Sequence, residues 1–159
     1  MDISKEYLEF LMDEAIQEAE AAFAEGEVPI GAVVAVGEAI VARAHNRMES
    51  VKNAAAHAEL LAVQQASQVV KDWRLTEALL CVTLEPCTMC IGAVRLARIP
   101  TLVYGAADER MGACGSLYDL SQDERLGPVP RVISGVRQDR CLQLLRTFFQ
   151  EKRRDGRVV

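Results

Sequence analysis

The sequence predicts an α/β fold in which helices cover both faces of a mixed sheet. Three patterns lead to this prediction: an amphipathic helix near the start, a two-strand hairpin after it, and then alternating strand and helix segments. The 159 residues are about one domain's length. No internal repeat or Ser/Gly-rich linker divides them. We therefore expect a single domain over residues 1–159.

The first helix is predicted over about residues 4–25, with Ser4 as a suitable N-cap and Gly26 as a suitable stop. Its apolar residues recur at helical spacing: Leu8, Leu11, Met12, Ala15, Ile16, Ala19, Ala22 and Phe23. Two apolar runs follow, at about 30–36 and 39–44, separated by Gly37 and Glu38. Glycine in the first position of a two-residue loop suits a type II′ turn, so these runs form a predicted hairpin.

The rest of the chain alternates between the two kinds of element. Helices are predicted over about 57–70, 87–98 and 139–154, and strands over about 79–84, 101–105 and 131–136. Pro100 is expected to end the second of these helices. The strand, helix and strand between 79 and 105 predict a parallel pair with a right-handed crossover.

Charge is distributed unevenly along the chain. The net charge is −5, yet residues 1–30 hold nine acids and one base. The last 23 residues hold three acids and seven bases: Arg137, Arg140, Arg146, Lys152, Arg153, Arg154 and Arg157. On charge alone this basic C-terminal helix, from about residue 139, is either a solvated surface or a nucleic-acid contact.

Composition excludes several classes of protein. Half of the residues are hydrophobic, which excludes a disordered chain. No apolar run reaches the ~18 residues of a membrane helix, and the N-terminus lacks the pattern of a secretion signal. We expect no membrane association and a cytoplasmic location. Five cysteines, an odd number with one Cys-x-x-Cys pair, favour reduced thiols and a metal site over disulfides.

Two motifs at predicted helix N-termini carry the candidate chemistry: His57-Ala58-Glu59 and Pro86-Cys87-Thr88-Met89-Cys90. Cys87 and Cys90 are three residues apart and share one helix face. One His and two Cys suit zinc and leave its fourth position open for water, as in catalytic sites. Glu59 can then act as the base. The alternative is a structural zinc site whose fourth ligand is one of these residues: His45, Cys81, Cys114 or Cys141.

The order His-x-Glu and then Pro-Cys-x-x-Cys is typical of zinc-dependent nucleobase deaminases. Over nearly its whole length the sequence resembles the bacterial tRNA-specific adenosine deaminases of the cytidine/deoxycytidylate deaminase superfamily. The segments that carry the resemblance are VPIGAV (28–33), NR (46–47), AHAE (56–59), VTLEPCTMC (82–90), GA (92–93 and 105–106), GSL (115–117) and FF (148–149). The resemblance implies a cytidine-deaminase-like three-layer α/β/α sandwich with a five-stranded sheet, and a homodimer.

The same resemblance implies a role for each site residue. His57, Cys87 and Cys90 would hold one Zn²⁺ per subunit, and Glu59 would move protons. The residues that would meet the substrate are Asn46 at the purine ring, Val28 and Pro29 in the pocket wall, the backbone near Ala58, Leu84, Glu85 and Pro86, Asp108 at the nucleotide's backbone or sugar, and Phe149 and Arg153 on the tRNA-contacting C-terminal helix. The residues alone also allow a structural interpretation of three of these positions. Asn46 can be a turn residue, Asp108 can be a surface residue, and Phe149 can be a core residue.

The activity implied is zinc-dependent hydrolytic deamination of adenosine to inosine at the wobble position of a tRNA anticodon, typically of an arginine tRNA, with release of ammonia. The alternatives are a guanine or other free nucleobase or nucleotide deaminase, and a non-enzymatic RNA-binding zinc module. Two features depart from the family. The segment 53–56 is Asn-Ala-Ala-Ala where relatives often have Asp-Pro-Thr-Ala, and His45 stands where tryptophan is common.

Overall fold

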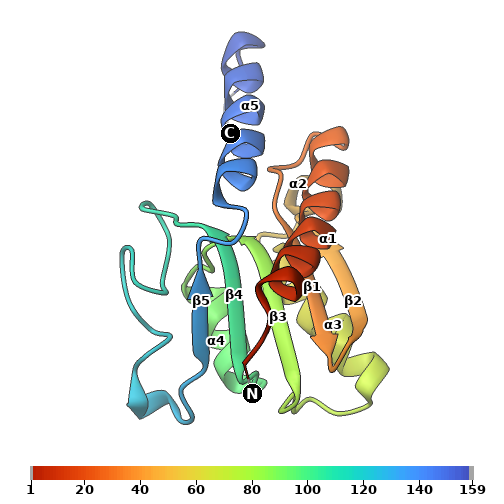
Figure 1. Ribbon diagram of the computed structural model, residues 1–159. Helices are drawn as coiled ribbons and strands as arrows, with labels where there is room; N and C mark the ends of the chain where they lie inside the picture. The colour runs from red at the N-terminus through yellow and green to blue at the C-terminus, as the bar shows by residue number, and fades with distance from the viewer. Residues whose placement is uncertain (1, 158–159) are drawn as a thin grey trace.

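A five-stranded mixed sheet runs through the centre of the computed structural model, which describes residues 2–157 (Figure 1). The strands are β1 (Gly31–Val36), β2 (Ala39–His45), β3 (Ala78–Leu84), β4 (Thr101–Ala106) and β5 (Arg131–Ser134). Their order in the sheet is β2-β1-β3-β4-β5. The β2/β1 and β1/β3 pairs are antiparallel, whereas β3/β4 and β4/β5 are parallel. The predicted strand, helix and strand unit is therefore confirmed.

The hairpin and the central strand follow from simple sequence patterns. Gly37 has a φ of 61°, and Val36 pairs with Ala39 across the two-residue turn, as the glycine predicted. All residues of β3 except Leu84 are buried. A strand with neighbours on both edges and helices on both faces must be apolar on both sides, which explains its continuous apolar run.

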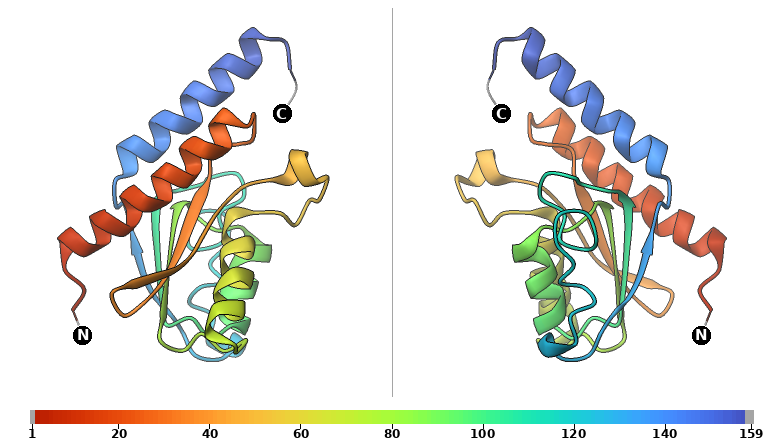
Figure 2. Two further views of the ribbon diagram at one scale, coloured as in Figure 1. Left: turned by 90° about the vertical axis from the view of Figure 1, so that its right-hand side faces the viewer. Right: turned by 90° about the vertical axis from the view of Figure 1, so that its left-hand side faces the viewer.

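Helices form a layer on each face of the sheet (Figure 2). These layers contain α1 (Lys5–Ala24), α3 (Ala58–Val70), α4 (Thr88–Leu96) and α5 (Gln138–Arg154), whereas the short α2 (Met48–Val51) has no buried residue and belongs to neither. Apolar residues of α1 and α5 pack on one face, and those of α3 and α4 pack on the other. This arrangement confirms the three-layer sandwich. Within residues 2–157, no helix combines the length and the apolar composition that crossing a bilayer requires.

Several boundaries differ from those predicted. Helix α4 ends at Leu96 with Ala97 as its C-cap, and Arg98 adopts a left-handed φ of 62°. The helix therefore ends two residues earlier than predicted, with Pro100 three residues after the C-cap. Strand β5 ends at Ser134, two residues early. The sequence pattern also missed α2 and a 3₁₀ turn at Glu124–Leu126, because elements this short show no apolar period.

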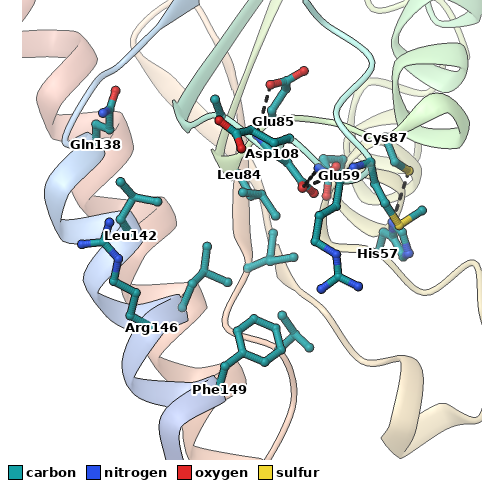
Figure 3. A pocket seen from close by; sticks show the side chains of 17 residues that line it. His57, Glu59, Leu84, Glu85, Cys87, Asp108, Gln138, Leu142, Arg146 and Phe149 are labelled. Atoms are coloured by element: carbon teal, nitrogen blue, oxygen red, sulfur yellow. Dashed lines mark hydrogen bonds between the residues drawn. The ribbon is translucent and has the colours of Figure 1, made fainter. Parts of the chain in front are cut away.

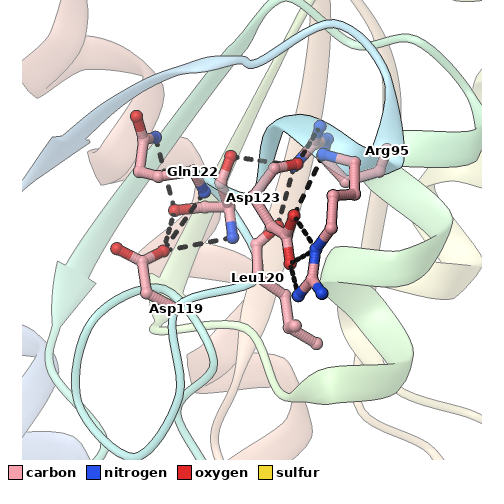
Figure 4. A network of polar contacts seen from close by, with 7 residues as sticks. Arg95, Asp119, Leu120, Gln122 and Asp123 are labelled. Carbon is pink, nitrogen blue, oxygen red and sulfur yellow. Dashed lines mark hydrogen bonds and ion pairs between the residues drawn. The ribbon is translucent and has the colours of Figure 1, made fainter.

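The long segment between β4 and β5 is fastened to α4 by one side chain, Arg95 (Figure 4). Its guanidinium is buried and donates hydrogen bonds only to main-chain carbonyls. The acceptors are the carbonyl oxygens of Leu120 (2.8 Å), Ser121 (3.1 Å), Asp123 (3.0 Å) and Gly127 (2.8 Å). A segment with little secondary structure thereby keeps a defined course beside the helix.

Candidate metal-binding active site

The two candidate motifs lie at the N-terminal ends of α3 and α4, on the same side of the sheet. His57 is the N-cap of α3, and Cys87 is the N-cap of α4. Cys90 lies one turn into α4, so it faces the same way as Cys87. Pro86 immediately precedes this cap residue. The end of each helix thus directs ligands toward one point.

The three candidate ligand atoms are close enough to hold a single ion. His57 Nδ1 lies 3.6 Å from Cys87 Sγ and 3.5 Å from Cys90 Sγ, and all three atoms lie within 4.8 Å of one another. Tetrahedral zinc with ordinary bond lengths would separate a sulfur and a nitrogen ligand by about 3.6 Å. The donor set and its spacing therefore fit a zinc ion with three protein ligands.

The two thiols differ in how readily they lose a proton. Hydrogen bonding to Cys90, with a further contribution from His57, lowers the pKa of the Cys87 thiol to about 4. Hydrogen bonding to Cys87, together with burial, raises the pKa of Cys90. The Cys90 thiol is thus the one that keeps its proton. A metal ion that takes both sulfurs as thiolates must displace that proton, so metal binding at this cluster depends on pH.

Glu59 lies beside the cluster and is almost completely buried, with 4% of its surface exposed. Burial, the largest influence, raises the pKa of its carboxyl group. A raised pKa brings a carboxyl group closer to neutral pH, where it can both accept and return a proton. His57, by contrast, faces the sulfur atoms with its Nδ1. The arrangement separates a group suited to proton transfer from three groups suited to metal binding.

A cavity of about 700 Å³ opens between these residues and helix α5 (Figure 3). His57, Glu59 and Cys87 form one end of it. Helix α5 forms the opposite wall, where Arg146 and Phe149 face the cavity. Residues 107–111, from the loop that follows β4, form a third wall. The volume falls within the range of small-molecule sites, ~300–1,000 Å³.

The predicted substrate residues are divided between this cavity and its surroundings. The residues that line it are Val28, Leu84, Glu85, Asp108 and Phe149, and Arg153 lines a smaller adjoining cavity of about 290 Å³. Pro29, Ala58 and Pro86 are buried and do not line the larger cavity. The Asn46 side chain accepts from the Met48 N–H (3.3 Å) and donates to the Val28 carbonyl (3.4 Å). These are the bonds of a turn residue, and its contact with a purine stays a prediction.

Several residues of the cavity wall were missed by the sequence analysis. They are Ile30, Ala107, Glu109, Arg110, Met111, Gln138, Leu142, Leu145 and Arg146. A usable signal existed on α5, where Gln138, Leu142, Leu145 and Phe149 recur at three- and four-residue spacing. Such spacing places them on one helix face. Without the packing of α5, however, the sequence does not reveal which face meets the cavity.

Acidic residues of α1 form ion pairs with some of the basic residues of the C-terminal helix. Arg137 pairs with Asp13 at 3.0 Å, and Arg140 pairs with Glu20 at 2.5 Å. Lys152 lies over the Phe148 ring, 5.2 Å from its centre. Arg146 and Arg153 instead line the two cavities. Arg137 and Arg140, near the start of α5, thus fasten it to α1, whereas Arg146 and Arg153 lie at the two cavities.

The residues considered for a fourth zinc ligand lie in other environments. Within residues 2–157, His57, Cys87 and Cys90 are the only group of three or more candidate ligands close enough to share an ion. His45 contacts Glu18 (2.6 Å) and Glu25 (3.0 Å). The Cys81 thiol lies beside Met12, and Cys114 lies near the Pro86 carbonyl. A four-ligand structural site therefore receives no support from the described residues.

This sandwich, with a His, two Cys and a buried Glu at two helix ends, defines a cytidine-deaminase-like deaminase. Comparison with known families agrees, since the MafB19-like deaminase family matches residues 8–153. A tRNA-specific adenosine deaminase of Bacillus subtilis is 47% identical over 151 residues, covering 95% of this chain and 94% of that protein. The chain therefore belongs to the family of tRNA-specific adenosine deaminases.

Solved structures show the same relationship. One, from studies of A-to-I editing by tRNA:A34 deaminases at the wobble position of transfer RNA, superposes with a TM-score of 0.81 and 39% identity. It matches 86% of this chain and 99% of that one. A guanine deaminase from Bacillus subtilis superposes with a TM-score of 0.60 and 32% identity, and covers 62% of this chain and 64% of that one. The tRNA deaminase thus matches more of the chain at higher identity.

Proposed function

We propose that this protein deaminates adenosine to inosine at the wobble position of a tRNA anticodon, typically that of an arginine tRNA, and releases ammonia. The observation that carries the proposal is the position of Glu59 and the His57, Cys87 and Cys90 cluster at one end of a cavity whose opposite wall is α5. That wall presents an aromatic ring and an arginine, which suit a base and a phosphate of an RNA strand. A tRNA substrate also implies a cytoplasmic location.

In this proposal His57, Cys87 and Cys90 hold one Zn²⁺ per subunit. Zinc bound there would supply the Lewis acidity that lets water act as a nucleophile near neutral pH. The oxygen of the attacking water bonds to C6 of adenine while Glu59 accepts a proton from that water. Glu59 delivers this proton to the ring nitrogen N1. Glu59 then takes the proton of the new C6 hydroxyl and delivers it to the amino group. The C6–N bond breaks, ammonia leaves, and C6 becomes the carbonyl of inosine.

An anticodon loop suits this cavity better than a duplex. The bases of the loop are already single-stranded, so turning one into the cavity avoids the few kcal/mol that flipping a paired base costs. A deaminase that acts on free nucleobases does not need the cavity wall that α5 forms. The guanine deaminase similarity keeps that activity as the second candidate.

The proposal includes a homodimer. On α4, Ile91 and Val94 are buried in the core, whereas Met89 and Leu96 are 37% and 76% exposed. The apolar surface of this helix thus exceeds what the core covers. Apolar side chains left outside the core can pack on a second copy of the chain.

The activity is tested by incubating the purified, zinc-loaded protein separately with a transcribed tRNA, its anticodon stem-loop, free adenosine and guanine. We expect inosine and ammonia in equal amounts from the RNA substrates and little product from the free compounds. A Glu59→Ala preparation, purified identically, controls for contaminating deaminases. Rapid release of ammonia from guanine with no inosine in RNA would replace the proposal with the nucleobase activity.

A further inference from the structure

Glu85 is a buried acid whose side chain takes no part in the chemistry above. It follows β3, lies two residues before Cys87, and is 2% exposed. Its carboxylate points away from Glu59 and His57 (Figure 3). Within the described chain, all of the hydrogen-bond donors to that carboxylate come from residues 107–118, which we call the cavity loop.

The two carboxylate oxygens of Glu85 hold different parts of the cavity loop. One oxygen, Oε1, accepts from the Asp108 N–H at 3.1 Å and from the Ser116 hydroxyl. The other, Oε2, accepts from the N–H groups of Cys114 (3.0 Å) and Ser116 (3.2 Å). Hydrogen bonds to an ionised acceptor are roughly twice as strong as neutral ones. Four donors thus satisfy a buried charge and order the loop around it.

The first half of the cavity loop depends most on this contact. Asp108 folds the segment locally, because its Oδ1 accepts from the N–H groups of Arg110 (3.0 Å) and Met111 (3.3 Å). Among the described residues, the bond from the Asp108 N–H to Glu85 is the only hydrogen bond that joins residues 107–111 to a residue outside the loop. The second half has a further main-chain anchor, from the Ala113 N–H to the Pro86 carbonyl at 2.9 Å.

Gly112 completes the packing around the carboxylate. A Cβ atom added at this glycine would overlap the Glu85 carboxylate and the Asp108 carbonyl oxygen. Both are held in place, by hydrogen bonds and by the backbone respectively, so neither can move aside cheaply. The glycine lets the loop pass close enough for the N–H groups to reach Glu85.

We propose that Glu85 is a positioning residue that fixes the first half of the cavity loop and thereby sets affinity for the target nucleotide. The inference rests on the function proposed above. Residues 107–111 form a cavity wall, and a wall that is already ordered loses less conformational entropy when the substrate binds. The metal cluster lies at the ends of α3 and α4. Loss of the Glu85 charge therefore weakens binding more than it slows the chemical step.

Glu85→Gln tests this inference because an amide can replace only one of the two carboxylate oxygens. If the amide oxygen accepts from Cys114 and Ser116, the amide NH₂ can donate to the Ser116 hydroxyl, but it cannot accept from the Asp108 N–H. We expect KM for the stem-loop to rise about tenfold and kcat to change by less than about twofold. Hydrogen exchange should accelerate at the Asp108 amide and stay slow at Cys114 and Ser116. Zinc content should be unchanged.

Glu124→Gln is the matched control, because it removes the same charge from an exposed residue outside the cavity. Gly112→Ala displaces the Glu85 carboxylate without changing its charge, and should also raise KM. This second variant keeps the test available if Glu85→Gln does not fold. An unchanged KM, a fall in kcat alone, or unchanged exchange at Asp108 would each overturn the inference. A wild-type protein inactive on the stem-loop would instead reject the proposed function, while the exchange measurement would still test the loop.

Discussion

Arg137 and Asp13 are 124 residues apart in the sequence, yet Arg137 Nε lies 3.0 Å from Asp13 Oδ1. Arg140 and Glu20 make a second ion pair between the same two helices. The acidic first helix thus neutralises the start of the basic last helix. For the proposed RNA substrate, the basic residues of α5 that remain beside the cavities are Arg146 and Arg153.

The first prediction concerns these remaining arginines. Arg146→Ala and Arg153→Ala should each weaken stem-loop binding and flatten the log–log salt dependence of affinity by roughly 0.7, the contribution of one single-strand phosphate contact. Arg140→Ala is the control, because it removes the same charge from a residue paired with α1. Fluorescence anisotropy over a range of salt concentrations measures the slope. An equal effect of all three substitutions would show that only net charge matters.

Glu59→Ala should abolish turnover while the fold and the metal content are retained. Glu59 is outside the group of three candidate ligands, and in the proposed mechanism it acts only on protons. Loss of a general acid–base typically slows a reaction by ~10²–10⁴-fold. Inosine formation under saturating substrate measures the effect, and elemental analysis measures zinc. Loss of zinc from this variant would mean that Glu59 is a ligand.

Cys87→Ala should lose most of the bound metal, because a thiolate is removed from a site with three protein ligands. Cys114→Ala is a close control: Cys114 is also buried near Pro86, but its thiol is outside the ligand group. Burial raises the pKa of Cys114 to about 12, which disfavours a thiolate there. Stoichiometric zinc in Cys87→Ala, with loss in Cys114→Ala, would reassign the ligand.

The His45 contacts predict a pH-dependent contribution to stability. Partial burial lowers the pKa of His45, but its hydrogen bonds to Glu18 and Glu25 outweigh that effect and the net shift is upward from 6.5. The stabilisation is therefore fully present below pH ~6.5, where the unfolded chain is also protonated, and is lost as pH rises through the folded pKa. Partly exposed pairs contribute about 0.2–1 kcal/mol each.

Thermal melting of the wild type and of His45→Gln, from below pH ~6.5 to above the folded pKa of His45, measures this contribution to stability. The wild type should melt higher at acidic pH, and the difference should shrink as pH rises. A Glu18→Gln variant, which removes the shorter of the two contacts, should show part of the same loss. A difference that is constant with pH would contradict the ion-pair explanation.

The proposed dimer makes a separate prediction for α4. Sedimentation at micromolar concentration should give about twice the chain mass of 17.5 kDa. Leu96→Glu, at an exposed position of α4, should shift the protein toward the monomer without unfolding it. The core-facing Ile91 offers no such test, because its replacement would damage the core. A wild-type monomer would leave the exposed Met89 and Leu96 without a partner.

Local patterns were enough to predict most of the fold and the centre of the site. The type II′ turn at Gly37, the continuous apolar run of β3 and the two motifs at helix starts depend on residues that are near one another in the sequence. The spacing of Cys87 and Cys90 needs only a helix to bring two sulfurs together. Such features can be inferred without knowledge of the packing.

What could not be predicted depends on distant residues. Helix α2 starts where it does because buried Glu27 accepts from the N–H groups of Glu49 (3.2 Å) and Ser50 (2.6 Å). The cavity loop likewise depends on Glu85, more than 20 residues earlier in the chain. Neither acid belongs to a periodic pattern. A buried carboxylate looks like any surface acid in the sequence until the fold surrounds it with donors.

The contact of Arg95 with the segment before β5 has an evolutionary consequence. All four acceptors are main-chain carbonyls, which every amino acid supplies. Substitutions over generations at exposed positions of this segment, such as Glu124 and Leu126, therefore leave the Arg95 contact intact. Arg95 has no such freedom, because lysine offers three donors at one point and cannot span four separated oxygens. The surface that this segment presents is thus open to change, whereas the side chain that holds it is not.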